Sequence, residues 1–219
     1  MPKEIKQNTY ESIREAIING VLKPGQAITE EWLSNYLSVS RTPVREAFIR
    51  LQSEGLVRIV KNKGAFVREI TSVDIGEIFQ IRKLLESFAA KACVDFIEVK
   101  EIGEIKDELE ELSLLEGHVS EKVELGIKLH KLIMESAGNH RLTYLVGMLS
   151  SQILWVRSLA QRIPGRVAKS INEHINIANA VYSRDKTRAE KCMMIHLDNV
   201  MKDILDVKNI QLFSNLRSR

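Results

Sequence analysis

The stretch SVSRTPVREAFIRLQSEGL, residues 38–56, decides the fold of the first part of the chain. Ser40 and Thr42 are both suited to cap a helix that begins here, because their side-chain oxygens can accept hydrogen bonds from first-turn N–H groups. The apolar residues that follow recur at helical spacing. Arg41 and Arg45, four residues apart, share the exposed face. We therefore expect an amphipathic helix that carries two arginines near its N-terminus.

Two further helices and a hairpin surround this helix in the sequence. Apolar spacing predicts a first helix at about 9–19. Thr29 is suited to cap a short second helix, with Trp32 and Tyr36 on the buried side. After the arginine-bearing helix, two β-rich runs between residues 56 and 70 flank the turn KNKG and predict a hairpin. Three small helices followed by a hairpin make a winged helix-turn-helix.

This arrangement points to DNA. The third helix of such a unit fits the major groove, and arginine is the side chain best suited to a bidentate contact with guanine. Lysines at the tip of the hairpin can reach phosphates, and a glycine there allows close approach. The alternative is that the arginines are ordinary solvated charges. The residues expected to contact DNA are Arg41, Thr42, Arg45, Lys61, Lys63 and Gly64.

The stretch from Gly20 to Val57 resembles the DNA-binding domain of the GntR family of bacterial transcription regulators. It follows the pattern G-x-L-x-P-G-x-x-(I/L)-x-E-x-x-L-x-x-x-L-x-V-S-R-T-P-V-R-E-A-x-x-R-L-x-x-E-G-L-V. The resemblance implies operator contacts by the recognition-helix arginines and by the wing tip. Some family members carry a further DNA-contacting arginine on the second helix. The aligned position is Glu31 here, so no contact is carried over to it.

Composition supports a mainly α-helical protein. Of 219 residues, 44% are hydrophobic and only 5% aromatic, with 11 glycines and 4 prolines, which is unlike an all-β chain. The net charge of +3 comes from residues 1–70, where 11 Lys and Arg face 8 Asp and Glu; residues 71–219 hold 21 of each kind. No apolar run is long enough to span a membrane, and the N-terminus does not look like a secretory signal. We expect a cytoplasmic protein.

Beyond the hairpin, every segment has helical period. One long helix is expected from about residue 72, and five more at about 100–115, 121–136, 140–160, 167–183 and 186–207. Phe88 is among the residues expected to face the interior of the first of them. The prediction is therefore a winged helix-turn-helix over 1–70 and an all-α helical-bundle effector domain over 71–219.

Histidines carry the chemistry of the second domain. His130, His174 and His196 each lie mid-helix on a largely apolar face, whereas His118 and His140 fall at helix ends and are expected at the surface. Each of the three alone is more often a core histidine than a ligand. Three on separate helices of one bundle can converge on a single ion, and imidazole suits Zn²⁺ or Ni²⁺.

The same region resembles the FadR-subfamily (FCD-type) effector domain, on the residues 81–92 and the segments LHKLIMESAGN, NEHINI and MIHLDN. In its metal-binding branch, the resemblance implies a divalent metal held by the three histidines and by an Asp four residues before the first. That position is Gly126 here, which supplies no ligand, and the nearby Glu124 points off that face. The resemblance also implies an effector-binding arginine, for which Arg82 is the candidate. The alternative is a surface ion pair between Arg82 and Glu86.

Together these features predict a DNA-binding transcription regulator that is not an enzyme. We expect a homodimeric repressor that binds double-stranded operator DNA and responds to a small carboxylate effector. Two alternatives stay open. One is a metal-dependent enzyme built on the three histidines, although no nucleophile or dinucleotide motif supports it. The other is a bundle with degenerate histidines and no ligand response.

Overall fold

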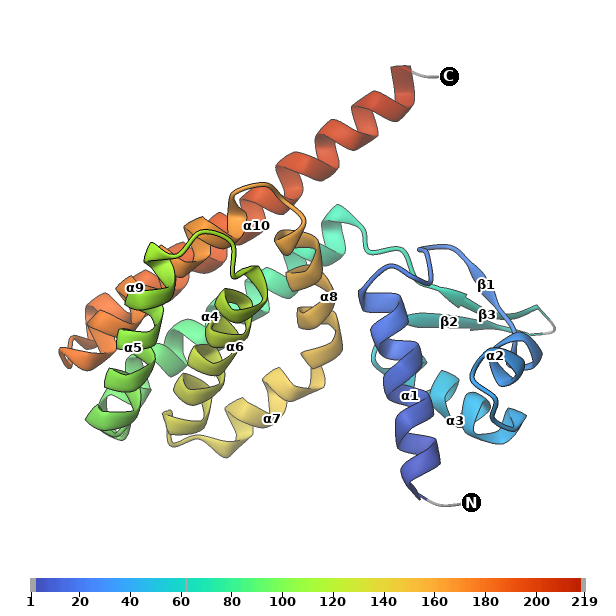
Figure 1. Ribbon diagram of the computed structural model, residues 1–219, viewed down its shortest axis with the longest axis horizontal. Helices are drawn as coiled ribbons and strands as arrows, with labels where there is room; N and C mark the ends of the chain where they lie inside the picture. The colour runs from blue at the N-terminus through green and yellow to red at the C-terminus, as the bar shows by residue number, and fades with distance from the viewer. Residues whose placement is uncertain (1–2, 62, 218–219) are drawn as a thin grey trace. The chain divides into compact units, whose positions relative to one another are not determined.

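The computed structural model describes residues 3–61 and 63–217, with side chains described for 7–61 and 63–208. Contacts group the chain into two compact units. The first unit comprises the residues up to Thr71 together with Met148–Ser158, and the second comprises Ser72–Gly147 and the residues from Leu159 onward. Helices dominate both, and the first also holds a small sheet (Figure 1). The predicted fold class, a winged helix-turn-helix followed by a helical bundle, is confirmed. The boundary at residue 70 stays a prediction.

The first unit contains the three predicted helices and a three-stranded antiparallel sheet in the order β1-β3-β2. Its elements are α1 (Lys3–Ile18), β1 (Ala27–Ile28), α2 (Glu30–Tyr36), α3 (Arg41–Ser53), β2 (Val57–Val60) and β3 (Gly64–Val67). The hairpin pairs Val57 with Val67 and Val60 with Gly64. Strand β1, which the sequence analysis did not predict, pairs Ile28 with Ala65 and so adds a third strand to the wing.

Local signals in the sequence explain where these elements begin. The Thr29 hydroxyl accepts a hydrogen bond from the Trp32 backbone N–H at 3.1 Å and caps α2. Ser40 is the residue before α3, and Thr42 lies inside the helix rather than at its cap. Gly64 begins β3 with a φ of 87°, in the left-handed region that glycine adopts without strain.

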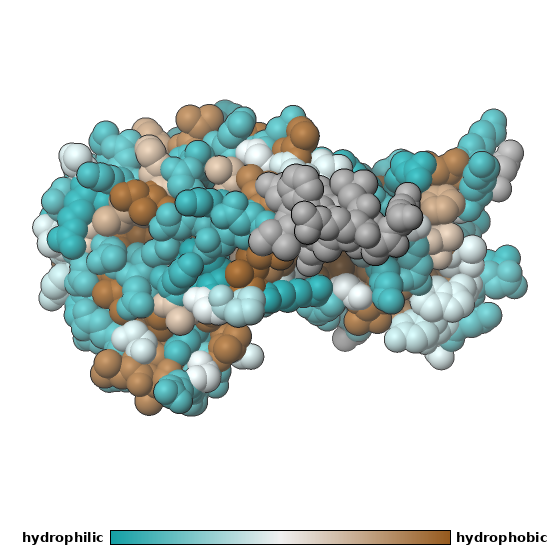
Figure 2. Space-filling view, turned by 90° about the horizontal axis from the view of Figure 1, so that it is seen from above, coloured by the Kyte–Doolittle hydropathy of each residue, from teal (hydrophilic) through white to brown (hydrophobic). Residues whose placement is uncertain are grey.

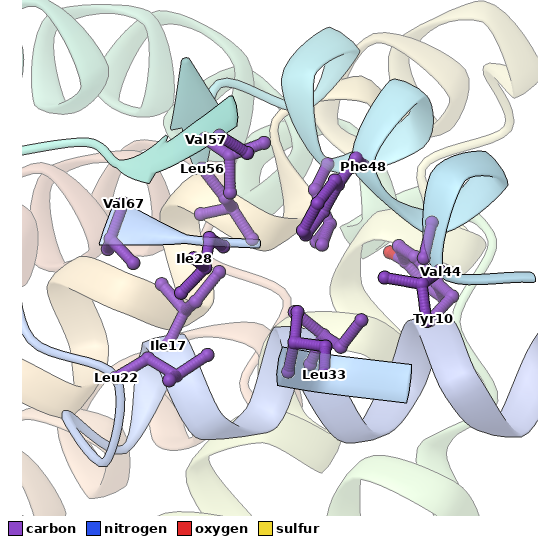
Figure 3. Packing of buried hydrophobic residues seen from close by; sticks show 14 of the residues in the cluster. Tyr10, Ile17, Leu22, Ile28, Leu33, Val44, Phe48, Leu56, Val57 and Val67 are labelled. Carbon is purple, nitrogen blue, oxygen red and sulfur yellow. The ribbon is translucent and has the colours of Figure 1, made fainter. Parts of the chain in front are cut away.

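One apolar core holds the first unit together (Figure 3). Phe48 and Leu51 of α3 pack into it as predicted. Trp155, from α8 (Ser150–Gln161), joins the same core, so part of a helix expected in the second domain packs with the winged helix instead. The predicted burial of Trp32 and Tyr36 is wrong. Their side chains are 43% and 65% exposed, and the two rings stack on each other with centroids 5.3 Å apart.

The second unit is built from α-helices with one short 3₁₀ turn. Its elements are α4 (Ser72–Ala92), η1 (Cys93–Asp95), α5 (Val99–Leu114), α6 (Val119–Ser136), α7 (His140–Met148), the last residues of α8, α9 (Arg166–Tyr182) and α10 (Lys186–Arg217). Helix α4 packs along α10, and α9 packs between α5 and α10. The single helix predicted over 140–160 is two, α7 and α8. Phe88, predicted inside, is half exposed on α4.

Within the described ranges, we find no helix that combines the length and the apolar character needed to cross a bilayer. Both cysteines are free thiols. Cys93 is buried, which raises the pKa of its thiol to about 12, and Cys192 is partly buried.

Candidate metal centre and DNA-binding surface

The two predicted recognition arginines lie at the exposed N-terminal end of α3. The Arg45 guanidinium donates two hydrogen bonds to the Glu30 carboxylate, at 2.8 and 2.7 Å. The Arg41 guanidinium donates one to Glu31, at 3.0 Å. Both acceptors belong to the first turn of α2. The start of α2 and the start of α3 therefore share one surface.

The remaining predicted DNA contacts are also exposed. Thr42 lies beside Arg41 on α3, and Lys61, Lys63 and Gly64 surround the turn between β2 and β3. The hydrogen bond from Arg45 holds the pKa of the Glu30 carboxyl below its usual value. These side chains are open to a partner such as a phosphate or a base edge.

The structure brings the three predicted histidines together inside the bundle. His130 comes from α6, His174 from α9 and His196 from α10, and each is at most 7% exposed. One ring nitrogen from each lies within 4.8 Å of the others, and the ring centroids are 4.6–5.3 Å apart. Three imidazole nitrogens this close can bind one divalent ion.

Carboxylates orient two of the three rings. His130 Nδ1 lies 2.7 Å from a Glu86 oxygen, and His196 Nδ1 lies 2.7 Å from a Glu173 oxygen. A carboxylate beside Nδ1 places the proton on that nitrogen and presents the Nε2 lone pair for coordination. This is the usual arrangement of supporting carboxylates around metal-binding histidines, and the donor set therefore fits a metal ion.

The first carboxylate is held by the predicted effector residue. Arg82 Nε donates to Glu86 at 2.6 Å, and both side chains are 4% exposed. The alternative raised from the sequence was a surface ion pair between these residues. The ion pair is present, but it is buried rather than at the surface. Burial alone would raise the pKa of Glu86, but the Arg82 charge and the His130 hydrogen bond hold it well below its usual range.

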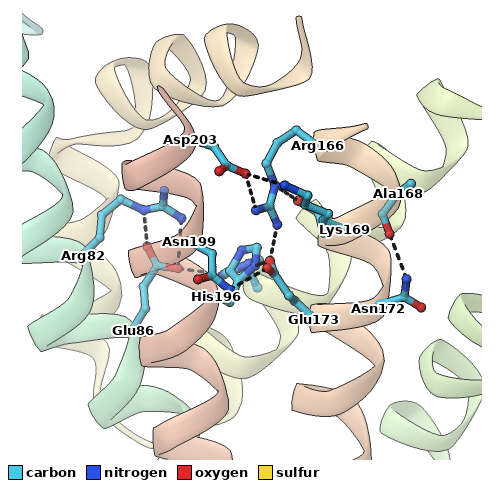
Figure 4. Close-up of polar contacts among 12 residues, drawn as sticks. Arg82, Glu86, Arg166, Ala168, Lys169, Asn172, Glu173, His196, Asn199 and Asp203 are labelled. Atoms are coloured by element: carbon cyan, nitrogen blue, oxygen red, sulfur yellow. Dashed lines mark hydrogen bonds and ion pairs between the residues drawn. The ribbon is translucent and has the colours of Figure 1, made fainter. Parts of the chain in front are cut away.

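A second polar network supports His196 (Figure 4). Glu173 pairs with the guanidinium of Arg166, which is 2% exposed, and accepts a hydrogen bond from Asn199 at 2.9 Å. Arg166 also contacts Asp203 at 3.0 Å. Burial raises the pKa of Glu173 despite these donors. Burial also lowers the pKa of the His196 ring well below its usual value, so the ring is neutral at pH 7 and can act as a ligand.

Gly126 has a structural consequence that the sequence did not reveal. A Cβ placed on this residue would lie 2.4 Å from His174 Cε1 and 2.8 Å from His174 Nδ1. Real Cβ atoms do not approach other atoms this closely. The His174 ring therefore occupies the space into which a side chain at position 126 would project.

Sequence reasoning missed the supporting residues Glu86, Glu173 and Arg166. The sequence suggests Glu86 only as a partner for Arg82. Glu173 immediately precedes the predicted ligand His174, but this position does not show where the Glu173 side chain points. Arg166 follows a turn and resembles a solvated charge in the sequence. Because these contacts join residues up to 44 positions apart, no local pattern indicates them.

A winged helix-turn-helix joined to a helical bundle with a buried polar site defines a DNA-binding regulator with its own sensor domain. Residues 5–67 match the gntR family of bacterial regulatory proteins, and residues 77–199 match the FCD domain. The chain belongs to the GntR family and has an FCD effector domain. This family consists of transcription regulators, not enzymes, that bind operator DNA and usually act as dimers with small-molecule effectors.

Known proteins resemble the chain along most of its length. The HTH-type regulator YdhC of Bacillus subtilis is 28% identical over 193 residues, which cover 87% of this chain and 86% of YdhC. The HTH-type transcriptional repressor RspR of Escherichia coli is 23% identical over 206 residues, covering 93% and 90%. The structure of E. coli McbR/YncC superposes with a TM-score of 0.72 at 21% identity, covering 97% of this chain and all of that one, which supports the shared fold.

Proposed function

We propose that the protein is a transcription repressor whose operator binding responds to a small carboxylate bound at a metal centre. The observation that carries this proposal is the buried cluster of His130, His174 and His196, with carboxylates at two of the rings. These imidazoles would hold the ion, and a nitrogen-only donor set favours Zn²⁺ or Ni²⁺ over Mg²⁺ or Mn²⁺. The bound ion would supply Lewis acidity toward an effector carboxylate. Repression is the role named for RspR.

Arg82 is our candidate for a second contact with the effector. Its guanidinium donates to one oxygen of Glu86, and the other oxygen of Glu86 lies 2.7 Å from His130 Nδ1, so a single carboxylate joins Arg82 to the cluster. An effector carboxylate that reached Arg82 would compete with Glu86 for the same donors. Since Glu86 orients His130, this competition would link effector binding to the ligand cluster.

Helix α8 offers a route from the site to the winged helix. Ser151 donates to the Glu54 carboxylate at 2.6 Å, and Trp155 lies in the winged-helix core. The helix continues to Gln161, and α9 begins after a short turn with Arg166, the partner of Glu173. We propose that effector binding shifts α8 through this connection and so changes operator affinity. The DNA partner implies the cytoplasm of a bacterium.

For the DNA-binding surface we propose contacts by Arg41, Thr42, Arg45, Lys61, Lys63 and Gly64. We expect Arg45→Ala to weaken binding by about 10- to 100-fold on an operator recovered from a random-sequence library, because a base contact is lost. Fluorescence anisotropy of labelled duplex measures this. Lys128→Ala is the control, because this substitution also removes one exposed positive charge, but from the surface of α6. Equal affinities for wild type and Arg45→Ala would exclude Arg45 from the interface.

We further propose that the FCD unit mediates dimerisation through α4. Apolar patches interrupt the hydrophilic surface of the molecule (Figure 2). On α4, the side chains of Ile81, Leu84 and Phe88 are 43%, 74% and 50% exposed and are spaced to form one stripe. A second copy of the chain is the occupant that a regulator of paired DNA half-sites requires. In a two-fold dimer, the stripe of each copy would pack against the same stripe of the other copy, and both would be removed from water.

Light scattering tests the dimer. Wild type should have twice the 25.0 kDa mass of the chain, and Leu84→Glu should run as a monomer because it places a charge in the interface. Leu114→Glu, at a position 85% exposed on α5, should remain dimeric. A dimeric Leu84→Glu protein would move the interface elsewhere.

A further inference from the structure

We infer that Glu31 is a specificity-determining residue that selects cytosine in the operator. The inference rests on the proposed role of Arg41 in DNA binding. It begins with the difference between the two acids of α2. Glu30 accepts hydrogen bonds from two nitrogens of Arg45, Nε and Nη2, and its side chain is 29% exposed. Glu31 makes one contact with Arg41, and its side chain is 70% exposed.

These two geometries indicate different roles. The bidentate pair fixes the direction of the Arg45 fork and leaves Glu30 with little capacity for another partner. The single 3.0 Å contact leaves one Glu31 oxygen and further lone pairs available. Because Arg41 itself is 62% exposed, the Arg41–Glu31 pair faces outward as a unit at the start of the recognition helix.

The chemistry of the major groove decides what such a carboxylate can accept. Guanine presents the acceptors N7 and O6, and thymine presents the acceptor O4, so both repel a carboxylate. Cytosine presents an N4 amino donor, for which Glu and Asp are the matching side chains. Phosphate oxygens also repel Glu31. Adenine also presents an amino donor, at N6, but the N7 acceptor beside it opposes a carboxylate. A cytosine near the guanine contacted by Arg41 therefore satisfies both members of the pair best, since the guanidinium donates to one base and the carboxylate accepts from the other.

Glu31 should therefore lower affinity for most sequences and preserve it for those with cytosine at one position. In wild type, replacing that cytosine should weaken binding by about 5- to 100-fold, the usual range for one mismatched base pair. In Glu31→Gln, the same replacement should change affinity by less than about 3-fold, because an amide can donate as well as accept. Removing a negative charge should also strengthen non-specific binding.

The experiment is selection from a random-sequence duplex library with full-length wild type, Glu31→Gln and Glu15→Gln, followed by anisotropy titrations on single-base variants of the selected site. Glu15 is an exposed acid on α1, so Glu15→Gln controls for the change in net charge. We expect one strict cytosine position in the motifs of wild type and Glu15→Gln and a relaxed one in that of Glu31→Gln. An unchanged Glu31→Gln motif would overturn the inference. So would relaxation at the guanine position alone, which would mean that Glu31 merely orients Arg41.

Arg41→Ala separates this inference from the proposed DNA surface. If Arg41→Ala loses operator affinity while Glu31→Gln keeps the wild-type motif, the surface is right and the role of Glu31 is wrong. If Arg41→Ala binds as wild type, the surface itself is wrong. Circular dichroism should show all these variants folded, because an exposed ion pair contributes less than about 1 kcal/mol to stability.

Discussion

Gly126→Ala should abolish tight metal binding although Gly126 offers no ligand atom. The added methyl group would lie 2.4 Å from His174 Cε1, so the ring must leave its position or α6 and α9 must separate. Either change disperses the three nitrogens. We expect zinc affinity to fall by at least the 10- to 100-fold that loss of a supporting residue typically causes. The free energy of unfolding should fall by about 1–3 kcal/mol from overpacking.

Gly76→Ala is the matched control for this substitution. Gly76 lies within α4, and a Cβ there meets nothing within 4 Å. The exchange should raise the free energy of unfolding by up to about 1 kcal/mol through helix propensity and leave zinc affinity unchanged. Competition with a chromophoric zinc indicator measures both affinities. Zinc affinity of Gly126→Ala equal to that of wild type would show that His174 does not depend on the space at position 126.

Gly126→Asp extends the same argument. This substitution introduces a carboxylate at position 126, where the resemblance to the metal-binding branch implies an Asp ligand. The Cβ of Asp meets the same His174 atoms as the Cβ of Ala. We therefore expect the same zinc competition assay to show no gain in affinity over wild type; a higher affinity would mean that the His174 ring moves aside for the new carboxylate.

Arg166→Met should give the largest loss of stability in the second unit. The substitution keeps much of the apolar stem but leaves Glu173 and Asp203 without their shared cation. Breaking a buried ion pair from one side typically costs 3–5 kcal/mol, and we expect about 3 kcal/mol because Asp203 is partly exposed. Urea unfolding followed by circular dichroism at 222 nm measures this. Tryptophan fluorescence would not, since Trp32 and Trp155 both belong to the first unit.

Two companion variants make this prediction specific. Lys169→Met removes a cation that is 65% exposed and 3.6 Å from Asp203, and should change stability by less than about 1 kcal/mol. Adding Asp203→Asn to Arg166→Met should recover part of the lost stability, because one of the two carboxylates that Arg166 neutralises is gone. Similar losses for Arg166→Met and Lys169→Met would show that the buried pair is not the source.

The winged helix could be predicted because its signals are local. Helix spacing, the Thr29 cap and the arginine-bearing helix all lie within short windows of sequence, and the structure confirms each of them. The two-residue strand β1 could not be predicted, since it has no periodicity and exists only through its pairing with β3. Trp32 and Tyr36 were predicted inside because spacing shows which residues share a face but not whether anything covers that face.

Part of the candidate site could also be predicted from the sequence, and part could not. The histidines were found because three of them fall mid-helix on apolar faces, and the bundle brings them together. Their supporting carboxylates were not found, because whether Glu86 points into the bundle depends on how α4 packs against α6. The effect of Gly126 was likewise invisible, because the space beside it is filled by a residue 48 positions later in the chain.

Metal content tests the central claim of a three-histidine centre most directly. Untagged wild type, His174→Ala and His118→Ala would be purified without chelator, and their metal content would be measured by inductively coupled plasma mass spectrometry. His118 is the control because it is exposed at the start of α6. Our account predicts close to one zinc or nickel ion per chain in wild type and His118→Ala, and little in His174→Ala. Metal-free wild type that also fails to take up added zinc or nickel would contradict it.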